Sequence, residues 1–178
     1  MKNIKDQVNL AGKIVLLRLD LNVPLKNKDV LDETRIDKII PVINFLLKNK
    51  AKILIISHVG RPRGKKNNDL SLKPICLNLE KKIKKKIKLI TSNLYEMTKD
   101  KLFMQEEEVI FLENIRFYQE EEINDSKFAK QIASLGDLYV NDAFSCSHRD
   151  HASISKITEF LPSYAGLQLQ SEINALKK

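Results

Sequence analysis

The chain has 178 residues, of which 43% are hydrophobic, so it is long enough to fold around its own core and too apolar to be disordered. Its formal charge is +8 and its pI about 9.4, yet lysine supplies 25 of the basic residues and arginine only six. Because only 6% of residues are aromatic and there is no Trp, a stacking platform for bases is excluded. We expect the lysine excess to be solvated surface charge.

Cysteine usage and hydropathy bound the cellular setting. Cys76 and Cys146 lack the spacing of metal ligands, and a reduced protein is expected. No apolar run reaches transmembrane length and no signal peptide is recognisable. We therefore expect a cytoplasmic protein without a metal site or a membrane partner.

Short apolar runs alternate with longer stretches of helical periodicity along the whole chain. The predicted strands are residues 13–19, 51–57, 87–90, 108–113 and 137–141. Four of them are almost continuously apolar, which predicts a sheet covered on both faces. This alternation predicts an α/β fold: a three-layer α/β/α, Rossmann-like domain with a mainly parallel sheet.

Helices are predicted between and after these strands. The first follows Arg35, and Pro41 predicts either a late start or a kink in it. Ser71 is expected to cap a second helix, and Asp125 a third that closes at Gly136. Three further helices are predicted at residues 94–102, 153–160 and 166–176. The last pattern reaches the end of the sequence without a capping glycine, so the chain looks cut rather than finished.

Polar side chains follow four of the predicted strands. They include Asp20, Asn22, His58, Glu113, Asn114, Arg116, Asn141, Asp142, His148, Arg149 and His151. Parallel strands end at one edge of the sheet, where open α/β folds bind ligands, so these loops are expected to converge. Taken singly, Asp20 fits an Asx-turn, His58 a cap, and Arg116 or Arg149 a surface ion pair. The acidic run at 119–123 is expected to be solvated.

Arginine is concentrated in the same loops. Arg61, Arg63, Arg116 and Arg149 follow strands, Arg35 begins a helix beside them, and only Arg18 lies elsewhere, inside a strand. A guanidinium holds phosphate or carboxylate through two parallel hydrogen bonds, which lysine cannot do. The pattern predicts a site for a small phosphorylated ligand that also carries a carboxylate. Asp20 and Asn22 would bind a hydroxyl or orient a guanidinium.

Other chemistries lack their motifs. The five glycines form neither dinucleotide-binding nor P-loop patterns, so no nucleotide-phosphate loop is expected in this chain. The segment "SCS" at 145–147 lacks the nucleophile elbow of hydrolases. His148 and His151 alone do not make a zinc site.

Five motifs in order resemble phosphoglycerate kinase, and the resemblance runs from residue 4 to residue 178. They are "RLDLNVP", "DETRI", "SHVGRPRG", "LENIRF" and "YVNDAFSCSHRDHAS". The resemblance implies that residues 1–178 form a single substrate-binding domain, the N-terminal half of a two-domain kinase, ending at the interdomain helix. It implies 3-phosphoglycerate or 1,3-bisphosphoglycerate as ligand, held by Asp20, Leu21, Asn22, Arg35, His58, Val59, Gly60, Arg61, Arg116 and Arg149. Arg35 would be catalytic, beside the transferring phosphoryl group, and Arg63 is left unassigned.

The resemblance also implies partners outside this chain. Mg-ATP or Mg-ADP would be bound by a C-terminal domain that the chain lacks. The resemblance thus implies a monomeric glycolytic enzyme, of which this chain alone would be an incomplete part. Leu21 stands where the family usually has Phe, Ser145 replaces a usual Gly, and Asp150, which could partly neutralise Arg149, replaces a usual Ala. Two other functions stay open: a nucleic-acid-binding module using Lys81–Lys88 and a non-catalytic sugar-phosphate sensor.

Overall fold

A computed structural model describes residues 2–7 and 9–177. The predicted domain, residues 1–178, therefore includes three positions, 1, 8 and 178, that lie outside the described residues. Within the described ranges no helix is long and apolar enough to cross a membrane.

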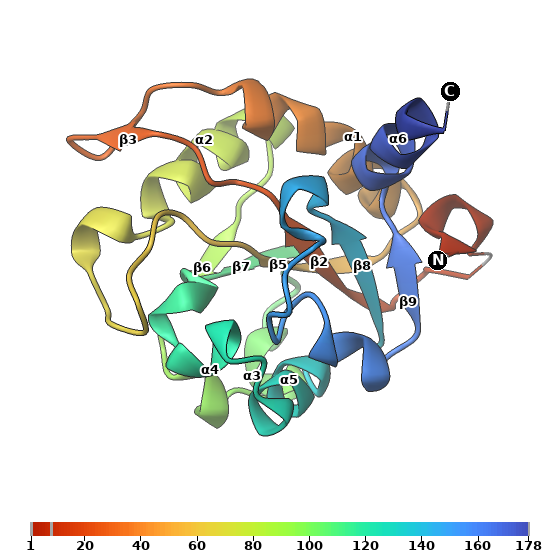
Figure 1. Cartoon of the computed structure of the whole chain (residues 1–178). Helices are drawn as coiled ribbons and strands as arrows, with labels where there is room; N and C mark the ends of the chain where they lie inside the picture. Colours follow the sequence, from red (N-terminus) through yellow and green to blue (C-terminus); the bar gives the residue numbers. More distant parts are fainter. Residues whose placement is uncertain (1, 8, 178) are drawn as a thin grey trace.

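A sheet of seven parallel strands forms the centre of the described structure (Figure 1). In spatial order the strands are β1 (Lys2–Asn3), β9 (Ser163–Ala165), β8 (Leu138–Asp142), β2 (Ile14–Leu19), β5 (Lys52–Ile56), β7 (Val109–Leu112) and β6 (Lys88–Ile90). A separate antiparallel pair, β3 (Leu25–Lys26) and β4 (Asp29–Val30), lies in the connection after β2. The predicted α/β fold with a mainly parallel sheet is confirmed, and so are all five predicted strands.

Helices cover both faces of the sheet. In Figure 1, α1 (Thr34–Lys48), α2 (Lys73–Ile83) and α6 (Leu167–Leu176) lie on one side, and α3 (Lys99–Leu102), α4 (Gln119–Glu122) and α5 (Ser126–Ala133) on the other. Side chains alternate across a strand, so Val15 and Leu17 of β2 belong to the core beneath α1, while Leu16 packs with Phe128 of α5. Two cores on one buried sheet explain the continuous apolar runs.

The helix signals are mostly confirmed. Asp125 Oδ1 accepts the N–H of Phe128 at 2.7 Å at the start of α5. Ser71 Oγ accepts the N–H of Lys73 at 3.2 Å, although the capping position itself is one residue later. The late start of the first helix is wrong, because α1 begins at Thr34 and runs through Pro41.

Two other helices are shorter than predicted. Residues 94–102 divide into a 3-10 helix, Leu94–Glu96, and α3, because Asn93 and Thr98 each cap a new start. The helix predicted at 153–160 is wrong: turns precede a 3-10 helix at Lys156–Glu159. The physical reason is that Ser153 bonds through its N–H and its hydroxyl to Glu121, which holds the segment away from helical geometry.

Candidate functional site

The loops after β2, β5, β7 and β8 surround one cavity of about 270 Å³. The strands β2 and β8 are neighbours, but the chain leaves β2 towards β5 and leaves β8 towards β9, on opposite sides. This is the switch point at which open α/β sheets bind ligands. The cavity is lined by Asp20, Asn22, Arg35, His58, Gly60, Arg61, Arg116, Ser145, Cys146 and Arg149.

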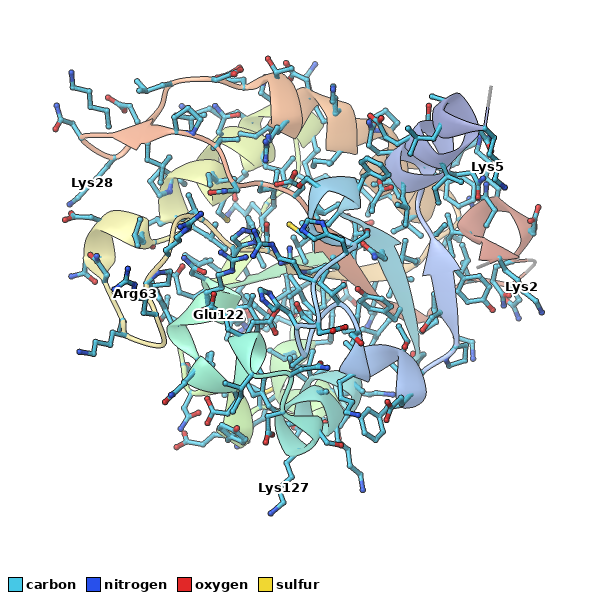
Figure 2. All side chains as sticks on the ribbon, viewed as in Figure 1. Lys2, Lys5, Lys28, Arg63, Glu122 and Lys127 are labelled. Atoms are coloured by element: carbon cyan, nitrogen blue, oxygen red, sulfur yellow. The ribbon has the colours of Figure 1, made fainter. Side chains whose placement is uncertain are left out.

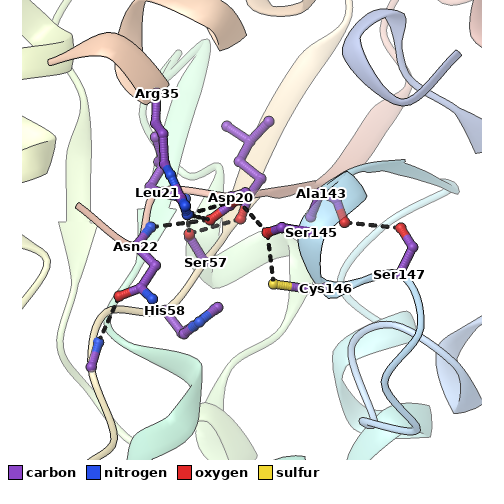
Figure 3. A network of polar contacts seen from close by, with 12 residues as sticks. Asp20, Leu21, Asn22, Arg35, Ser57, His58, Ala143, Ser145, Cys146 and Ser147 are labelled. Carbon is purple, nitrogen blue, oxygen red and sulfur yellow. Dashed lines mark hydrogen bonds and ion pairs between the residues drawn. The ribbon is translucent and has the colours of Figure 1, made fainter. Parts of the chain in front are cut away.

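Asp20 is the carboxylate of this cavity and is held from three sides (Figure 3). Arg35 Nη1 donates to its Oδ1 at 2.7 Å and to its Oδ2 at 2.9 Å, and the Ser145 hydroxyl also donates to Oδ2. The backbone N–H of Asn22 reaches Oδ1 at 3.3 Å, while the Asn22 amide oxygen accepts the N–H of Gly60 at 3.0 Å. Arg35 uses one nitrogen for Asp20 and its side chain is 47% exposed, so the rest of its guanidinium is accessible from the cavity.

His58 contributes a neutral ring to the cavity wall. It is buried, and burial, followed by the charge of Arg18 and then of Arg116, lowers the pKa of His58 to about 2. Arg18 Nη2 lies 3.0 Å from His58 Nδ1. The prediction that Arg18 lies apart from the site is wrong, because its guanidinium contacts the ring of His58, which lines the cavity. A charged residue within an otherwise apolar strand was the available signal.

Arg116 is buried and only partly satisfied. Its Nη1 donates to Gly60 O at 3.2 Å, and its backbone carbonyl accepts the N–H of Gly64 at 3.1 Å, which ties two loops together. Its Nε has no partner within the described structure. Burial lowers the pKa of Arg116 from its ordinary value. A buried cation with a free donor beside a cavity suits an anionic ligand.

Arg61 and Arg149 are exposed and line the cavity, whereas Arg63 does not. Figure 2 shows Arg63 in the loop between β5 and α2, with Lys2, Lys28 and Lys127 at the periphery of the molecule. No ion pair joins Arg149 to Asp150 in the part of the chain that the structure describes. The cavity thus brings together four arginines and one carboxylate.

Leu21 and Val59, also predicted site residues, lie in the core behind the cavity. The N–H of Leu21 donates to Ser57 Oγ at 3.2 Å, and the carbonyl of Val59 accepts from Asn114 at 2.8 Å. These contacts fix the loops that carry the neighbouring polar residues. Gly60 has φ +64°, and a Cβ there would lie 2.7 Å from a Leu70 methyl group, so a larger residue would be strained and would displace Leu70.

Other polar residues of the same loops serve the fold. Glu113 accepts from the Leu72 N–H at 2.7 Å and from the Ser71 hydroxyl at 2.6 Å, at the start of α2. Asn141 and Asp142 are the last residues of β8, so the strand predicted at 137–141 runs one residue further, to Asp142. Asp142 accepts the N–H of Leu169 in α6, and burial raises the pKa of its carboxyl group to about 6.

The lysine-rich segment is paired with carboxylates. Lys82 lies 2.6 Å from Glu33 and 2.7 Å from Asp37. Lys85 pairs with Glu108 at 2.6 Å, and Lys88 with Glu107 at 2.9 Å. These acids cancel much of the positive field that a nucleic-acid module would need.

Comparisons with known proteins agree on one family. The family model of phosphoglycerate kinase matches residues 4–178. The phosphoglycerate kinase of Wolbachia pipientis wMel is 53% identical over 174 residues, 97% of this chain and 44% of the relative. That of Dictyoglomus turgidum is 44% identical over 177 residues, 99% of this chain and 44% of the relative. The chain therefore spans less than half the length of these relatives.

Solved structures give the same answer. The phosphoglycerate kinase of Coxiella burnetii superposes with a TM-score of 0.88 and 36% identity, covering 98% of this chain and 44% of that one. The enzyme of Pyrococcus horikoshii OT3 has a TM-score of 0.87 and 27% identity, over 99% of this chain and 45% of that one.

Proposed function

Because this chain belongs to the phosphoglycerate kinase family, we propose that its cavity binds 3-phosphoglycerate, and 1,3-bisphosphoglycerate in the reverse direction, for phosphoryl exchange with ADP and ATP in glycolysis. The observation that carries the proposal is the cavity itself: Arg35, Arg61, Arg116 and Arg149 line it together with a single, already engaged carboxylate. This excess of positive charge fits a small ligand with a phosphate and a carboxylate group.

In this proposal, different residues bind different groups of the ligand. His58, Arg61, Arg116 and Arg149 bind the phosphate, with the unpaired Nε of Arg116 among the donors. Asp20 and Asn22, held by each other and by Gly60, meet the hydroxyl group. Leu21, Val59 and Gly60 act through their backbone, by fixing these loops.

The reaction requires little acid–base chemistry. The carboxylate of 3-phosphoglycerate is already a nucleophile, so a carboxylate oxygen attacks the terminal phosphorus of ATP, and ADP leaves with the electrons of the broken P–O bond. Arg35 is the proposed catalytic residue. Its exposed guanidinium nitrogens stabilise the charge on the transferring group, while the nitrogen bonded to Asp20 fixes its direction.

The nucleotide half of the reaction lies beyond these residues. The family uses a Mg-nucleotide, but four arginines and a carboxylate that already accepts from Arg35 and Ser145 do not suit Mg²⁺, which prefers free carboxylate and water oxygens. We assign the Mg-nucleotide to a separate C-terminal domain and residues 1–178 to one substrate-binding domain. Closure of the two would exclude water. We further propose that the protein is monomeric and cytoplasmic, in keeping with the free thiols of Cys76 and Cys146.

Titration of 3-phosphoglycerate into the 178-residue chain, followed by amide NMR shifts, tests the proposal. Shifts are expected at residues 20–22, 58–61, 116 and 149, with little change at the lysine-rich segment 81–88. Shifts scattered elsewhere would contradict the binding site. A coupled assay with Mg-ATP is expected to detect no turnover by the chain alone, and turnover would contradict the separate nucleotide domain.

A further inference from the structure

Arg18 is a buried cation without a carboxylate in direct contact. Its side chain is fully buried, and each of its three nitrogens has a different partner. Nε donates to Ser153 Oγ at 3.0 Å, Nη1 donates to Leu19 O at 2.6 Å, and Nη2 lies 3.0 Å from His58 Nδ1. Burying a guanidinium in this way costs stability, so apolar packing alone does not account for it.

A second buried ionisable group, Glu121, bonds to Ser153 on the side away from the guanidinium, and burial raises the pKa of its carboxyl group. Glu121 of α4 is fully buried, so the prediction that all acids at 119–123 are solvated is wrong. Its Oε1 accepts the Ser153 hydroxyl at 2.5 Å, and its Oε2 accepts the Ser153 N–H at 2.9 Å. The Ser153 hydroxyl thus accepts from Arg18 and donates to Glu121, which fixes the position of Arg18 relative to α4.

The contact with His58 determines which ring nitrogen carries the proton. A guanidinium only donates, so His58 Nδ1 must be the unprotonated acceptor. Burial, followed by the charges of Arg18, Arg116 and Arg149, keeps the ring neutral. A neutral ring with a free Nδ1 carries its hydrogen on Nε2. His58 therefore offers one N–H donor and no lone pair on that nitrogen.

We propose that Arg18 is a positioning residue of the anion site: through its hydrogen bond to Nδ1 it locks His58 in the Nε2–H tautomer, and Ser153 and Glu121 hold the guanidinium in place. The identity of the ligand, 3-phosphoglycerate, rests on the proposed function, whereas the tautomer of His58 follows from the contact with Arg18 alone. An imidazole with the opposite tautomer would present a lone pair to the phosphate and repel it. Arg18 prevents that without touching the ligand.

Imidazole ¹⁵N shifts of His58, recorded by NMR on the ligand-free chain, test the tautomer. The wild type is expected to show protonated Nε2 and free Nδ1 throughout pH 5–8. Arg18→Met is expected to give a mixture of tautomers and about tenfold weaker binding of 3-phosphoglycerate, the loss of one good hydrogen bond. Arg63→Ala, in the loop after His58 but outside the cavity, is the matched control and should change neither.

A second pair of variants keeps the test decisive if Arg18→Met does not fold. The amide nitrogen of His58→Gln replaces Nε2, whereas that of His58→Asn falls near Nδ1. The Asn variant is expected to bind 3-phosphoglycerate about tenfold more weakly than the Gln variant. A wild-type ring protonated on Nδ1, an unchanged tautomer in Arg18→Met, or equal binding by the two His58 variants would each overturn the inference. The expected tautomer without any binding of 3-phosphoglycerate would instead contradict the proposed function.

Discussion

Arg61 and Arg63 stand two positions apart in one loop, yet the fold gives them different surroundings. Arg61 lines the cavity beside Arg116, while Arg63 lies outside it with a left-handed backbone, φ 55°. Both are exposed, so composition and burial do not separate them. At the residue scale, the position of a side chain relative to the cavity decides whether its charge is available to a ligand or only to the solvent.

This difference predicts unequal effects of the same substitution. Arg61→Ala should weaken binding of 3-phosphoglycerate about tenfold or more, because it removes a charged hydrogen-bond donor from the cavity. Arg63→Ala, the matched control, should change the affinity less than about twofold. Isothermal titration calorimetry on both variants checks this. Similar losses in the two variants would mean that long-range charge, and not the cavity geometry, controls binding.

His58 predicts a pH dependence of stability. Its pKa is about 2 in the folded chain against an ordinary 6.5, so below pH 6.5 the unfolded state takes up a proton that the folded state does not. His58 therefore leaves the free energy of unfolding unchanged above pH 6.5 and lowers it as the pH falls from 6.5 towards the pKa of the folded chain. The slope reaches about 1.4 kcal/mol per pH unit.

Urea unfolding at pH 7 and pH 5 measures this contribution. The wild type should lose about 2 kcal/mol more between these two pH values than His58→Gln, which cannot take up the proton. The other shifted groups, such as His151 and Asp142, titrate in both proteins and cancel in the comparison. Equal losses would show that His58 is protonated in the folded chain.

At the scale of helices and loops, hydrogen bonds from side chains to the backbone hold the loops that line the cavity. Strands β2, β5, β7 and β8 end at one edge, and the loops that follow them are held by side chains bonding to backbone, such as Asn22 to Gly60 and Asn114 to Val59. Two of the helices, α3 and α5, begin at capping side chains, Thr98 and Asp125. Asp125, which begins α5, places Phe128 and Ile132 against the sheet.

Loss of this cap should destabilise the chain without affecting the cavity. Asp125→Ala should lower the free energy of unfolding by about 1 kcal/mol, because the N–H of Phe128 loses its acceptor. Lys127→Ala, an exposed change in the first turn of the same helix, should stay within about 0.5 kcal/mol of the wild type. Chemical denaturation measures both, and equal stabilities would show that the cap contributes nothing.

At the scale of the whole molecule, one sheet separates two cores, and the loops that line the cavity gather at one of its ends. The strand β2 lies between β8 and β5 and is buried throughout, whereas β1 and β6 are edges. Interior strands bond on both sides and open only with global unfolding. The floor of the cavity is therefore attached to the most stable part of the described structure.

Native-state hydrogen exchange should reflect this layout. Amides of β2, β5 and β8 are expected to exchange by global unfolding, and those of the edge strand β6 faster, through local opening. The exposed chain between β3 and β4 should exchange fastest. The matched comparison is β7 with β6, two parallel neighbours of which one is an edge. Equal protection of β6 and β2 would contradict this layering.

Some predictions needed only local information. The five main strands could be located because each is a continuous apolar run, and the cap at Asp125 because its hydrogen bond spans three residues. The strands β1 and β9 could not, since two or three residues acquire strand geometry only by pairing with each other and with β8. The prediction of a helix at 153–160 was wrong for the same reason. The hydrogen bonds of Ser153 go to Glu121, which is distant in sequence, and not to neighbours in a helix.

The sequence by itself determined the α/β class, the sheet edge that collects polar loops and the arginines in them, because strand ends and residue types are local properties. Tertiary structure alone decided which of these groups meet. It placed Leu21 and Val59 in the core, Arg63 outside the cavity, and Arg18 beneath His58. Burial and partners depend on segments far apart in the chain, and these determine the charge state and donor direction of His58.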